Sequence, residues 1–298
     1  MAGLGLMGTR AWTDSSAREM PKRPLGRTGL EVSLFSLGAQ GVIEQAGSEE
    51  ESQAIIHRAL DLGVNYIDTA PSYGNGVSER NLGEVMKHRR DEVFLASKTH
   101  DRSYDGTLRL IESSLERLQT DHLDLYQLHN IRTQSDLDRA FARNGAVRAM
   151  ERLRDDKVIR FLGITGHRDP AILRKGIERY DFDCILLALN AADKHHLPFQ
   201  DDVLPQAVER GLGVIAMKVP AHGRILRPDG VPTMEKALRY VWTFPVSTAI
   251  VGISRMAQLE ENISIARAFE PYSVPMMEQV ASRTAHYHEE ASWFKYYW

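Results

Sequence analysis

Residues 64–74, VNYIDTAPSYG, form an apolar segment that runs into a carboxylate and then a loop. The first seven residues read as a strand with Asp68 near its end, and Pro71 and Gly74 mark a loop that carries Tyr73. Short apolar runs bounded by turn residues are typical of strands buried on both faces of a parallel sheet. Seven further runs of this kind occur at fairly regular intervals: VSLFSLGA (32–39), VFLASKT (93–99), LDLYQLHN (123–130), IRFLGITG (159–166), CILLALNA (184–191), LGVIAMKV (212–219) and STAIVGIS (247–254).

Helix-like segments separate these runs. The first, residues 48–63, opens with Ser48 and has Glu51 three residues later, the pattern of a capping box, and closes on Gly63. Helical apolar spacing recurs in residues 107–118, 146–157, 169–180, 233–244 and 255–269. Eight strand–helix units without a dividing linker predict an α/β fold, a single (β/α)8 TIM barrel. The alternative is an open doubly wound sheet, but the chain lacks the glycine-rich G-x-G-x-x-G turn after its first strand.

Domain organisation follows from the same pattern. We expect one barrel domain over residues 22–298, which ends in a helical tail with the aromatic segment WFKYYW (293–298). Residues 1–21 are expected to form a flexible leader, because they lack the basic region and long apolar core of a signal peptide.

Composition excludes several classes of protein. The chain has 298 residues, of which 43% are hydrophobic and 26% charged, and its formal net charge is −3. These values are ordinary for a soluble globular protein and give no reason to expect nucleic acid or a membrane as partner. No apolar run approaches the roughly 20 residues that span a bilayer. The single cysteine, Cys184, excludes an intrachain disulfide and is expected to be a buried thiol, which fits a cytoplasmic location.

Four titratable residues stand at neighbouring strand ends. Asp68, Lys98 and His129 each lie near the end of an apolar run, and Tyr73 lies on the loop after Asp68. Each residue alone has a structural explanation: a capping carboxylate, a lysine that reaches water, a core histidine, a packed tyrosine. Active sites of barrels form at the C-terminal ends of the strands, so the four together predict a catalytic site.

The chemistry open to this group is specific. Tyrosine, with an ordinary pKa of about 10, is a proton donor at neutral pH. The ammonium of Lys98 is expected to lower the pKa of Tyr73, Asp68 to hold the lysine, and His129 to orient a substrate oxygen. Such a group donates a proton to a carbonyl oxygen while a hydride arrives at carbon. No side chain supplies hydride, so a nicotinamide cofactor is implied.

At these residues the chain resembles the aldo-keto reductase family. DTAPSYG, ASKT and DLYQLHN match the family's catalytic tetrad segments in order and spacing. GRTGLEVSLFSLG (26–38) is similar to its N-terminal hairpin and first strand, SLERLQTDHLDLYQLH (114–129) to the stretch before its histidine, and VGISRMAQLEEN (251–262) to its cofactor-phosphate segment. The resemblance covers about residues 22–268.

The resemblance implies roles for individual residues. Tyr73 is the general acid, Asp68 and Lys98 tune its pKa, and His129 orients the substrate. NADP(H) is the implied cofactor, with Ser254, Arg255 and Gln258 near the 2′-phosphate and Glu261 and Asn262 near the adenine. The full implied cofactor set is Gly38, Asp68, Gly166, His167, Asn190, Met217, Lys218, Gly252, Ser254, Arg255, Gln258, Glu261 and Asn262.

Some of these positions depart from the family pattern. Gly166 and His167 replace a Ser-Asn pair, Asn190-Ala191 replaces Asn-Gln, and Met217 stands where many relatives have a tyrosine that stacks on the nicotinamide. Lys218 is expected near the pyrophosphate. GITGH and MKVP resemble a branch in which some members append an iron–sulfur domain, and one cysteine is too few to ligate such a cluster.

Two functions follow as hypotheses. The first is an NADP(H)-dependent reductase or dehydrogenase that acts on an aldehyde, ketone or sugar. The alternative is a regulatory barrel that senses redox state through bound cofactor. No metal site is expected, since neither His195-His196 nor His286 and His288 belongs to a metal motif. The aromatic tail is expected to fold over the active-site mouth, or to pack on the barrel wall or on a second subunit in an oligomer.

Overall fold

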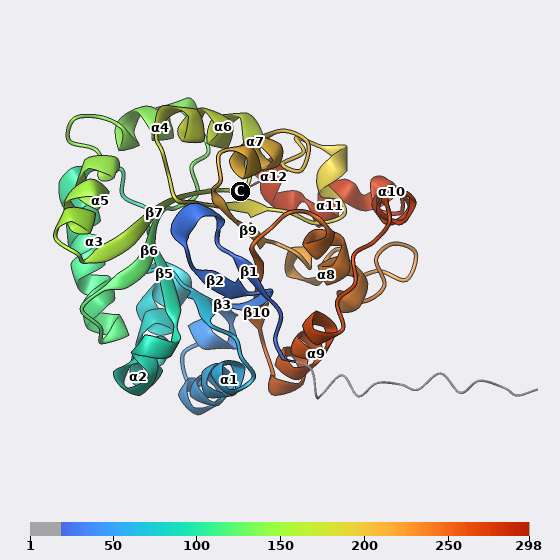
Figure 1. Ribbon diagram of the computed structural model, residues 1–298, viewed down its shortest axis with the longest axis horizontal. Helices are drawn as coiled ribbons and strands as arrows, with labels where there is room; N and C mark the ends of the chain where they lie inside the picture. The colour runs from blue at the N-terminus through green and yellow to red at the C-terminus, as the bar shows by residue number, and fades with distance from the viewer. Residues whose placement is uncertain (1–18, 298) are drawn as a thin grey trace, which may run out of the picture.

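The structure is a computed structural model that describes residues 19–297. Within these residues eight parallel strands close into a barrel (Figure 1), in the order β10-β3-β4-β5-β6-β7-β8-β9. The (β/α)8 prediction is confirmed, and each strand overlaps one of the eight apolar runs. The barrel strands are β3 (Phe35–Gly41), β4 (Tyr66–Asp68), β5 (Phe94–Thr99), β6 (Leu123–Leu128), β7 (Ile159–Gly166), β8 (Cys184–Ala188), β9 (Gly213–Met217) and β10 (Thr248–Ile253).

Helices surround the barrel (Figure 1). Buried apolar side chains of the helices and strands form the hydrophobic core. All six helical segments expected from apolar spacing are present. The helices are α1 (Glu49–Asp61), α2 (Val77–Arg89), α3 (Tyr104–Leu118), α4 (Gln134–Ala140), α5 (Ala146–Asp155), α6 (Pro170–Arg179), α7 (Val203–Glu209), α8 (Met234–Thr243), α9 (Met256–Arg267), α10 (Val274–Ser282), α11 (His288–Ala291) and α12 (Trp293–Tyr297).

The predicted capping box at the start of α1 is wrong. Ser48 is the N-cap residue, but its hydroxyl accepts no capping bond from a backbone N–H of the helix. The hydroxyl lies 2.7 Å from the carbonyl oxygens of both Val42 and Gln45 and donates its one hydrogen to either of them. Ser48 therefore fastens the loop after β3 to the helix, and that loop lines the cavity described below.

A hairpin closes the N-terminal end of the barrel. Strands β1 (Lys22–Pro24) and β2 (Glu31–Ser33) pair antiparallel, as the family resemblance predicted. Leu25 and Val32 are fully buried and pack with side chains of the barrel interior. The leader expected over residues 1–21 lies, up to residue 18, outside the described residues.

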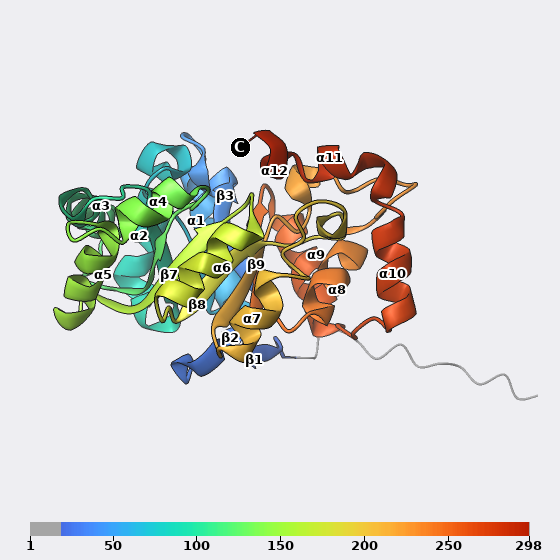
Figure 2. The same cartoon turned by 90° about the horizontal axis from the view of Figure 1, so that it is seen from above.

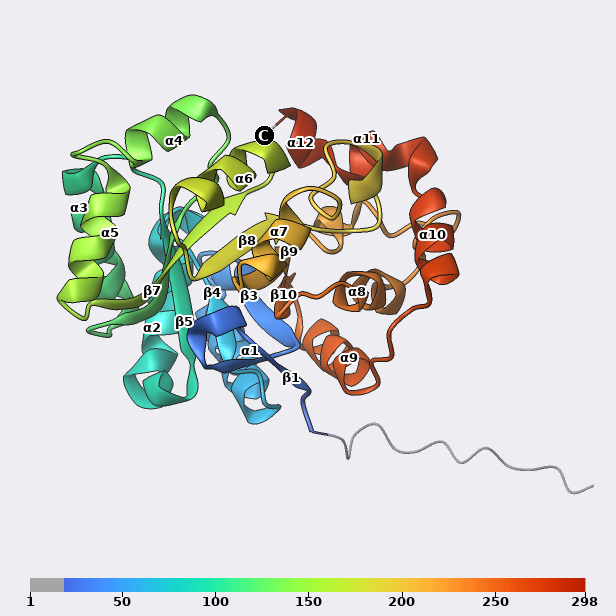
Figure 3. The same cartoon turned by 45° about the horizontal axis from the view of Figure 1, so that its top comes forward.

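The two chain ends cover opposite ends of the barrel. Figure 2 shows β1 and β2 below the strands and α11 and α12 above them. Figure 3 shows α10 leading away from α8 and α9 toward α11 and α12. The C-terminal helices therefore lie at the end where strand-end side chains gather.

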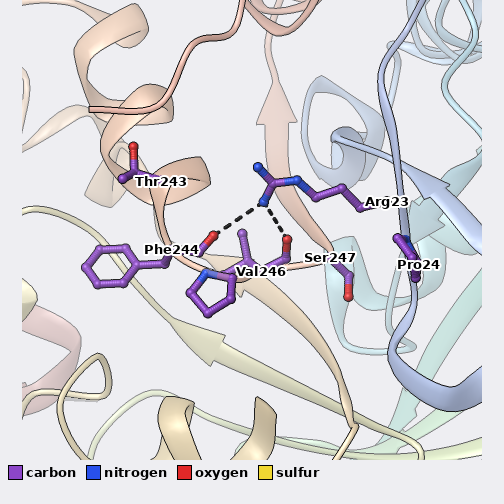
Figure 4. Close-up of a pocket in the computed structure, with 7 residues that line it drawn as sticks. Arg23, Pro24, Thr243, Phe244, Val246 and Ser247 are labelled. Atoms are coloured by element: carbon purple, nitrogen blue, oxygen red, sulfur yellow. Dashed lines mark hydrogen bonds between the residues drawn. The ribbon is translucent and has the colours of Figure 1, made fainter. Parts of the chain in front are cut away.

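A hollow of about 400 Å³ lies beside the hairpin (Figure 4). The guanidinium of Arg23 enters it and donates to the carbonyl oxygens of Trp242 at 2.8 Å and Val246 at 2.7 Å. These bonds hold the hairpin to the loop between α8 and β10. Among the described residues Arg23 is the only cation that lines this hollow, and backbone carbonyl oxygens already accept its N–H groups. We therefore assign the hollow a packing role.

Candidate active site

Asp68 and Lys98 form a buried ion pair at the carboxyl ends of β4 and β5. Both side chains are 1% exposed, and the Lys98 ammonium donates to the Asp68 carboxylate. It also donates to the Thr69 carbonyl at 2.8 Å and to the Tyr73 hydroxyl at 3.2 Å. The three N–H groups of the ammonium therefore each have an acceptor, and one of these is the tyrosine oxygen.

The loop after β4 explains why residues 64–74 pass from a buried strand into a turn that carries a tyrosine. The strand ends at Asp68, and the N–H of Tyr73 donates to the Ala70 carbonyl at 3.0 Å, which turns the chain back. Gly74 has φ +54, and a Cβ there would lie 2.0 Å from the Glu44 carbonyl oxygen. Only glycine fits this turn. The turn brings the Tyr73 ring over the Lys98 ammonium, 4.7 Å from the ring centroid.

His129 follows β6 and faces the tyrosine. The two rings are 6.1 Å apart between centroids and nearly perpendicular. Buried Arg102 donates to the carbonyls of His129 at 2.7 Å and of Asn130 at 3.1 Å, which fixes the backbone of this strand end. The structure thus brings together all four residues predicted from the strand ends.

Burial is the largest single influence on the pKa of each of the four, although Asp68 and Tyr73 together raise the pKa of Lys98. It raises the pKa of the Asp68 carboxyl, while the Lys98 ammonium opposes this rise. It also raises the pKa of Tyr73, and Lys98 lowers it by less, so the net direction is opposite to the expected lowering. Burial, with Lys98 and Arg102 nearby, lowers the pKa of His129 well below its usual value, so His129 is a neutral imidazole at neutral pH.

A cavity of about 730 Å³ extends from this group toward α9. Its lining includes Asp68, Tyr73 and His167, residues of β3 and β10, and the start of α9. Of the implied cofactor residues, the cavity wall includes Gly38, Asp68, His167, Met217, Lys218, Gly252, Ser254, Arg255, Gln258, Glu261 and Asn262.

The α9 end of the cavity carries an exposed cation. Arg255 is the N-cap residue of α9. No hydrogen bond or ion pair holds its guanidinium within residues 19–297. The neighbouring Ser254 N–H donates to Gln258 Oε1 at 2.9 Å, which orders the turn from β10 into the helix. An exposed guanidinium at a helix N-terminus is suited to bind a phosphate group.

Two implied cofactor residues do not line the cavity. The Asn190 side chain donates to the Lys218 carbonyl at 3.1 Å and accepts from the Ala192 N–H at 2.9 Å. It therefore shapes the loops after β8 and β9. Gly166 lies inside the strand wall, where a Cβ would lie 2.9 Å from Leu173.

The loop after β9 places His222, which the sequence analysis missed, beside the expected Lys218. Lys218 Nζ lies 3.0 Å from His222 Nε2, and both residues line the cavity. Burial, followed by the charge of Lys98, lowers the pKa of Lys218 to about 8. Both residues have φ near +60°, an uncommon conformation outside glycine that is concentrated at functional sites.

The C-terminal tail closes one side of the site. The ring of Phe294 lies edge-on to His167, 6.4 Å between centroids, and Trp293 lies edge-on to His222, 5.7 Å between centroids. Both histidines line the cavity. Of the placements expected for the aromatic tail, the structure shows packing of the chain on its own barrel at the active-site end. Trp298 lies outside the described residues.

Other features have structural explanations. Among residues 19–297 no group of three or more metal-ligating side chains is placed to hold a metal ion. His195 and His286 contact Thr284 and Asp229, respectively. Cys184 is buried as expected, and burial raises the pKa of its thiol. None of the helices in the described part of the chain combines the length and the apolar character required to cross a bilayer.

Known proteins share this arrangement. The model of the Aldo/keto reductase family matches residues 35–229. The chain is 29% identical over 290 residues to L-galactose dehydrogenase of Arabidopsis thaliana, covering 83% of this chain and 88% of that protein. It superimposes on aldo-keto reductase AKR11C1 from Bacillus halodurans, holo form, with TM-score 0.75 and 26% identity, covering 89% and 96% of the two chains.

A third comparison concerns a structure with bound cofactor. An aldo-keto reductase from Klebsiella pneumoniae in complex with NADPH matches with TM-score 0.73 and 22% identity, covering 90% of this chain and 96% of that one. At this identity the likeness shows the fold alone. The family model covers more than half of the chain and spans the whole segment that carries Asp68, Tyr73, Lys98 and His129. The chain therefore belongs to the aldo/keto reductase family of oxidoreductases.

Proposed function

We propose that the protein is an NADP(H)-dependent oxidoreductase that transfers a hydride between nicotinamide and a carbonyl or alcohol substrate, with Tyr73 as the general acid. The observation that carries the proposal is the bond between the Lys98 ammonium and the Tyr73 hydroxyl, at 3.2 Å, on the wall of a deep cavity. Aldehydes, ketones and sugars are the substrate classes to test first.

The cavity fits the implied cofactor in its donor set. It offers an exposed guanidinium at Arg255 and a proton donor at Tyr73 within one cavity. Between them β3 and β10 present glycine backbone, because Gly38 and Gly252 are register partners. A Cβ at Gly38 would lie 3.2 Å from the Gly252 nitrogen, so a side chain at this position would be crowded by β10. Arg255 and Gln258 are the residues that would hold the phosphate end.

The residues divide the chemistry among them. NADPH, when bound, supplies the hydride. Tyr73 donates its proton to the carbonyl oxygen, and the Lys98 ammonium stabilises the tyrosinate that remains. Neutral His129, with its ring against Tyr73, donates a hydrogen bond that orients the same oxygen. In the oxidative direction the same groups act in reverse, and tyrosinate takes the proton of the alcohol.

The test is single-turnover hydride transfer, followed by the loss of NADPH absorbance. A panel of aldehydes, ketones and sugars first identifies a substrate for the wild-type protein. Tyr73→Phe should then slow transfer by about 100- to 10,000-fold, the usual contribution of general acid catalysis. NADPH affinity should stay within about 3-fold, since the lost interaction belongs to the transition state.

Tyr180→Phe is the matched control. This tyrosine lies at the C-terminal end of α6, and the substitution removes a half-buried hydroxyl outside the cavity. It should leave the rate unchanged. Wild-type transfer in Tyr73→Phe would contradict the proposed acid role. NADPH binding without turnover on any carbonyl would favour the redox-sensing alternative.

A further inference from the structure

Gln127 contacts the catalytic group from inside the barrel. It lies on β6 as the register partner of Lys98 of β5 and is fully buried. Its amide nitrogen donates to Oδ2 of Asp68 at 3.0 Å. The other carboxylate oxygen of Asp68 accepts from Lys98. Among the described side chains, Gln127 and Lys98 are thus the two donors to this carboxylate.

The amide oxygen of Gln127 has a different environment. It is buried and has no hydrogen-bond partner among the described residues. A buried acceptor without a partner costs stability, so an apolar side chain of similar shape would suit the fold better at this position. Packing alone therefore does not account for an amide here, and the bond from its nitrogen to Asp68 does.

The neighbouring strand provides space for this side chain. Gly163 of β7 is the register partner of Gln127. A Cβ at Gly163 would lie 2.9 Å from Cγ of Gln127 and 3.2 Å from Leu125. The absence of a side chain at Gly163 thus leaves room for Gln127 to reach Asp68.

We propose that Gln127 is a positioning residue that keeps the shared proton of the Asp68–Lys98 pair on Lys98. The inference rests on the proposed function, since it concerns the same proton relay. A buried carboxylate and ammonium can exchange a proton and become a neutral acid and amine. A neutral amine would no longer stabilise tyrosinate at Tyr73.

Gln127 favours the ionised pair because its N–H bonds more strongly to a carboxylate than to a neutral acid. Burial raises the pKa of Asp68 and so favours the neutral pair, and the Gln127 amide opposes this rise. A hydrogen bond to a charged group corresponds to a factor of about 10 to 150 in the balance between the two forms.

Gln127→Met tests the inference, because methionine keeps the shape and removes the donor. We expect single-turnover hydride transfer to slow by about 10- to 100-fold. The alkaline limb of its pH profile should move to higher pH, in the direction of Lys98→Met, since less ammonium remains to lower the pKa of Tyr73. NADPH affinity and the unfolding midpoint serve as checks that the variant is folded.

Gln127→Glu provides a second readout that packing alone would not produce. Two carboxyl groups in contact share one proton, so the introduced acid donates to Asp68 at low pH. Its transfer rate should match wild type at low pH and fall as pH rises and the shared proton is lost. If Gln127→Met fails to fold, the pH profile of Gln127→Glu is the test of the inference. A profile equal to that of wild type overturns it.

Gly163→Ala tests the bond between Gln127 and Asp68 by crowding the Gln127 side chain from β7. It should slow transfer by displacing Gln127, and it should add little to the loss in Gln127→Met, because both act through one contact. Wild-type rate and pH profile in Gln127→Met would overturn the inference while Tyr73→Phe still lost activity. Wild-type transfer in Tyr73→Phe would overturn the proposed function itself.

Discussion

Lys295 of α12 lies fully buried against the carboxylate of Asp193, which belongs to the loop after β8. The ammonium also donates to the carbonyls of His196 at 2.8 Å and Leu197 at 2.9 Å. Asp193 accepts in addition from the N–H of Gln200 at 2.9 Å. One buried ion pair therefore joins the end of the chain to the active-site end of the barrel, close to the contacts that Trp293 and Phe294 make with the cavity wall.

We predict that Lys295→Met destabilises the protein by about 3–5 kcal/mol, because it leaves the Asp193 carboxylate buried without its cation. Chemical denaturation at pH 7 measures this loss. Combining Lys295→Met with Asp193→Asn should recover part of it, since the uncompensated charge is gone.

Lys194→Met is the matched control for this pair. Lys194 is exposed, adjacent to Asp193 in sequence, and the same residue type. Its substitution should change the free energy of unfolding by less than about 0.5 kcal/mol. Equal effects at Lys194 and Lys295 would mean that the buried pair does not hold the tail.

Arg255→Ala is predicted to discriminate between cofactors. A charge-assisted contact with a phosphate contributes about 1.5–3 kcal/mol, so NADPH affinity should fall by roughly 10- to 150-fold. NADH lacks the 2′-phosphate and should bind almost as before. Fluorescence titration with both cofactors measures the two affinities.

The control for Arg255 is Arg210→Ala. Arg210 is an exposed cation just after α7, at the opposite end of the barrel, so it reports the effect of net charge alone. Equal losses for NADPH and NADH in Arg255→Ala, or an equal loss in Arg210→Ala, would remove Arg255 from the phosphate site.

Sequence alone predicts the barrel and the catalytic group for a physical reason. Strands buried on both faces are continuously apolar, so an interruption by Asp68, Lys98 or His129 is conspicuous at a strand end. The turn that carries Tyr73 is also marked, because Pro71 and Gly74 are typical turn residues and the backbone at Gly74 requires glycine.

Other features depend on three-dimensional contacts that spacing does not encode. Ser48 has the local pattern of a capping box, yet carbonyls of the preceding loop compete for its hydroxyl. The tail reaches the cavity through an ion pair between residues far apart in sequence. Gln127 did carry a signal, since it is a polar residue inside an apolar run, but its partner Asp68 lies on another strand.

Lys98→Met should cut turnover. We expect the fold to be retained only if the Asp68 charge is removed as well. In the single variant the buried carboxylate loses its cation, which we expect to cost about 3–5 kcal/mol. In Lys98→Met with Asp68→Asn the loss of stability should be smaller, while single-turnover transfer stays at least about 100-fold below wild type. Recovery of transfer together with stability would contradict the role of the ammonium beside Tyr73.

His167 is predicted to make the protein sensitive to acid. The side chain is 4% exposed. Burial, followed by the nearby charges of Lys218 and His129, lowers the pKa of its imidazole well below the ordinary value. Below about pH 6.5 the unfolded chain therefore binds a proton at this residue before the folded protein does. Stability contributed by the neutral imidazole is thus present above that pH and is lost as pH falls toward the lowered pKa of the folded state.

The variant that tests this is His167→Gln, which keeps a polar side chain and removes the titration. Its free energy of unfolding relative to wild type should rise as pH falls from 7 to 5, by up to about 1.4 kcal/mol for each unit below pH 6.5. Urea denaturation across this range gives the difference directly. His57→Gln, on the exposed face of α1, is the control for replacing an imidazole at the surface. If His167→Gln and wild type lose stability in parallel, His167 does not stay neutral in the folded protein, and its contact with Phe294 must tolerate a charge.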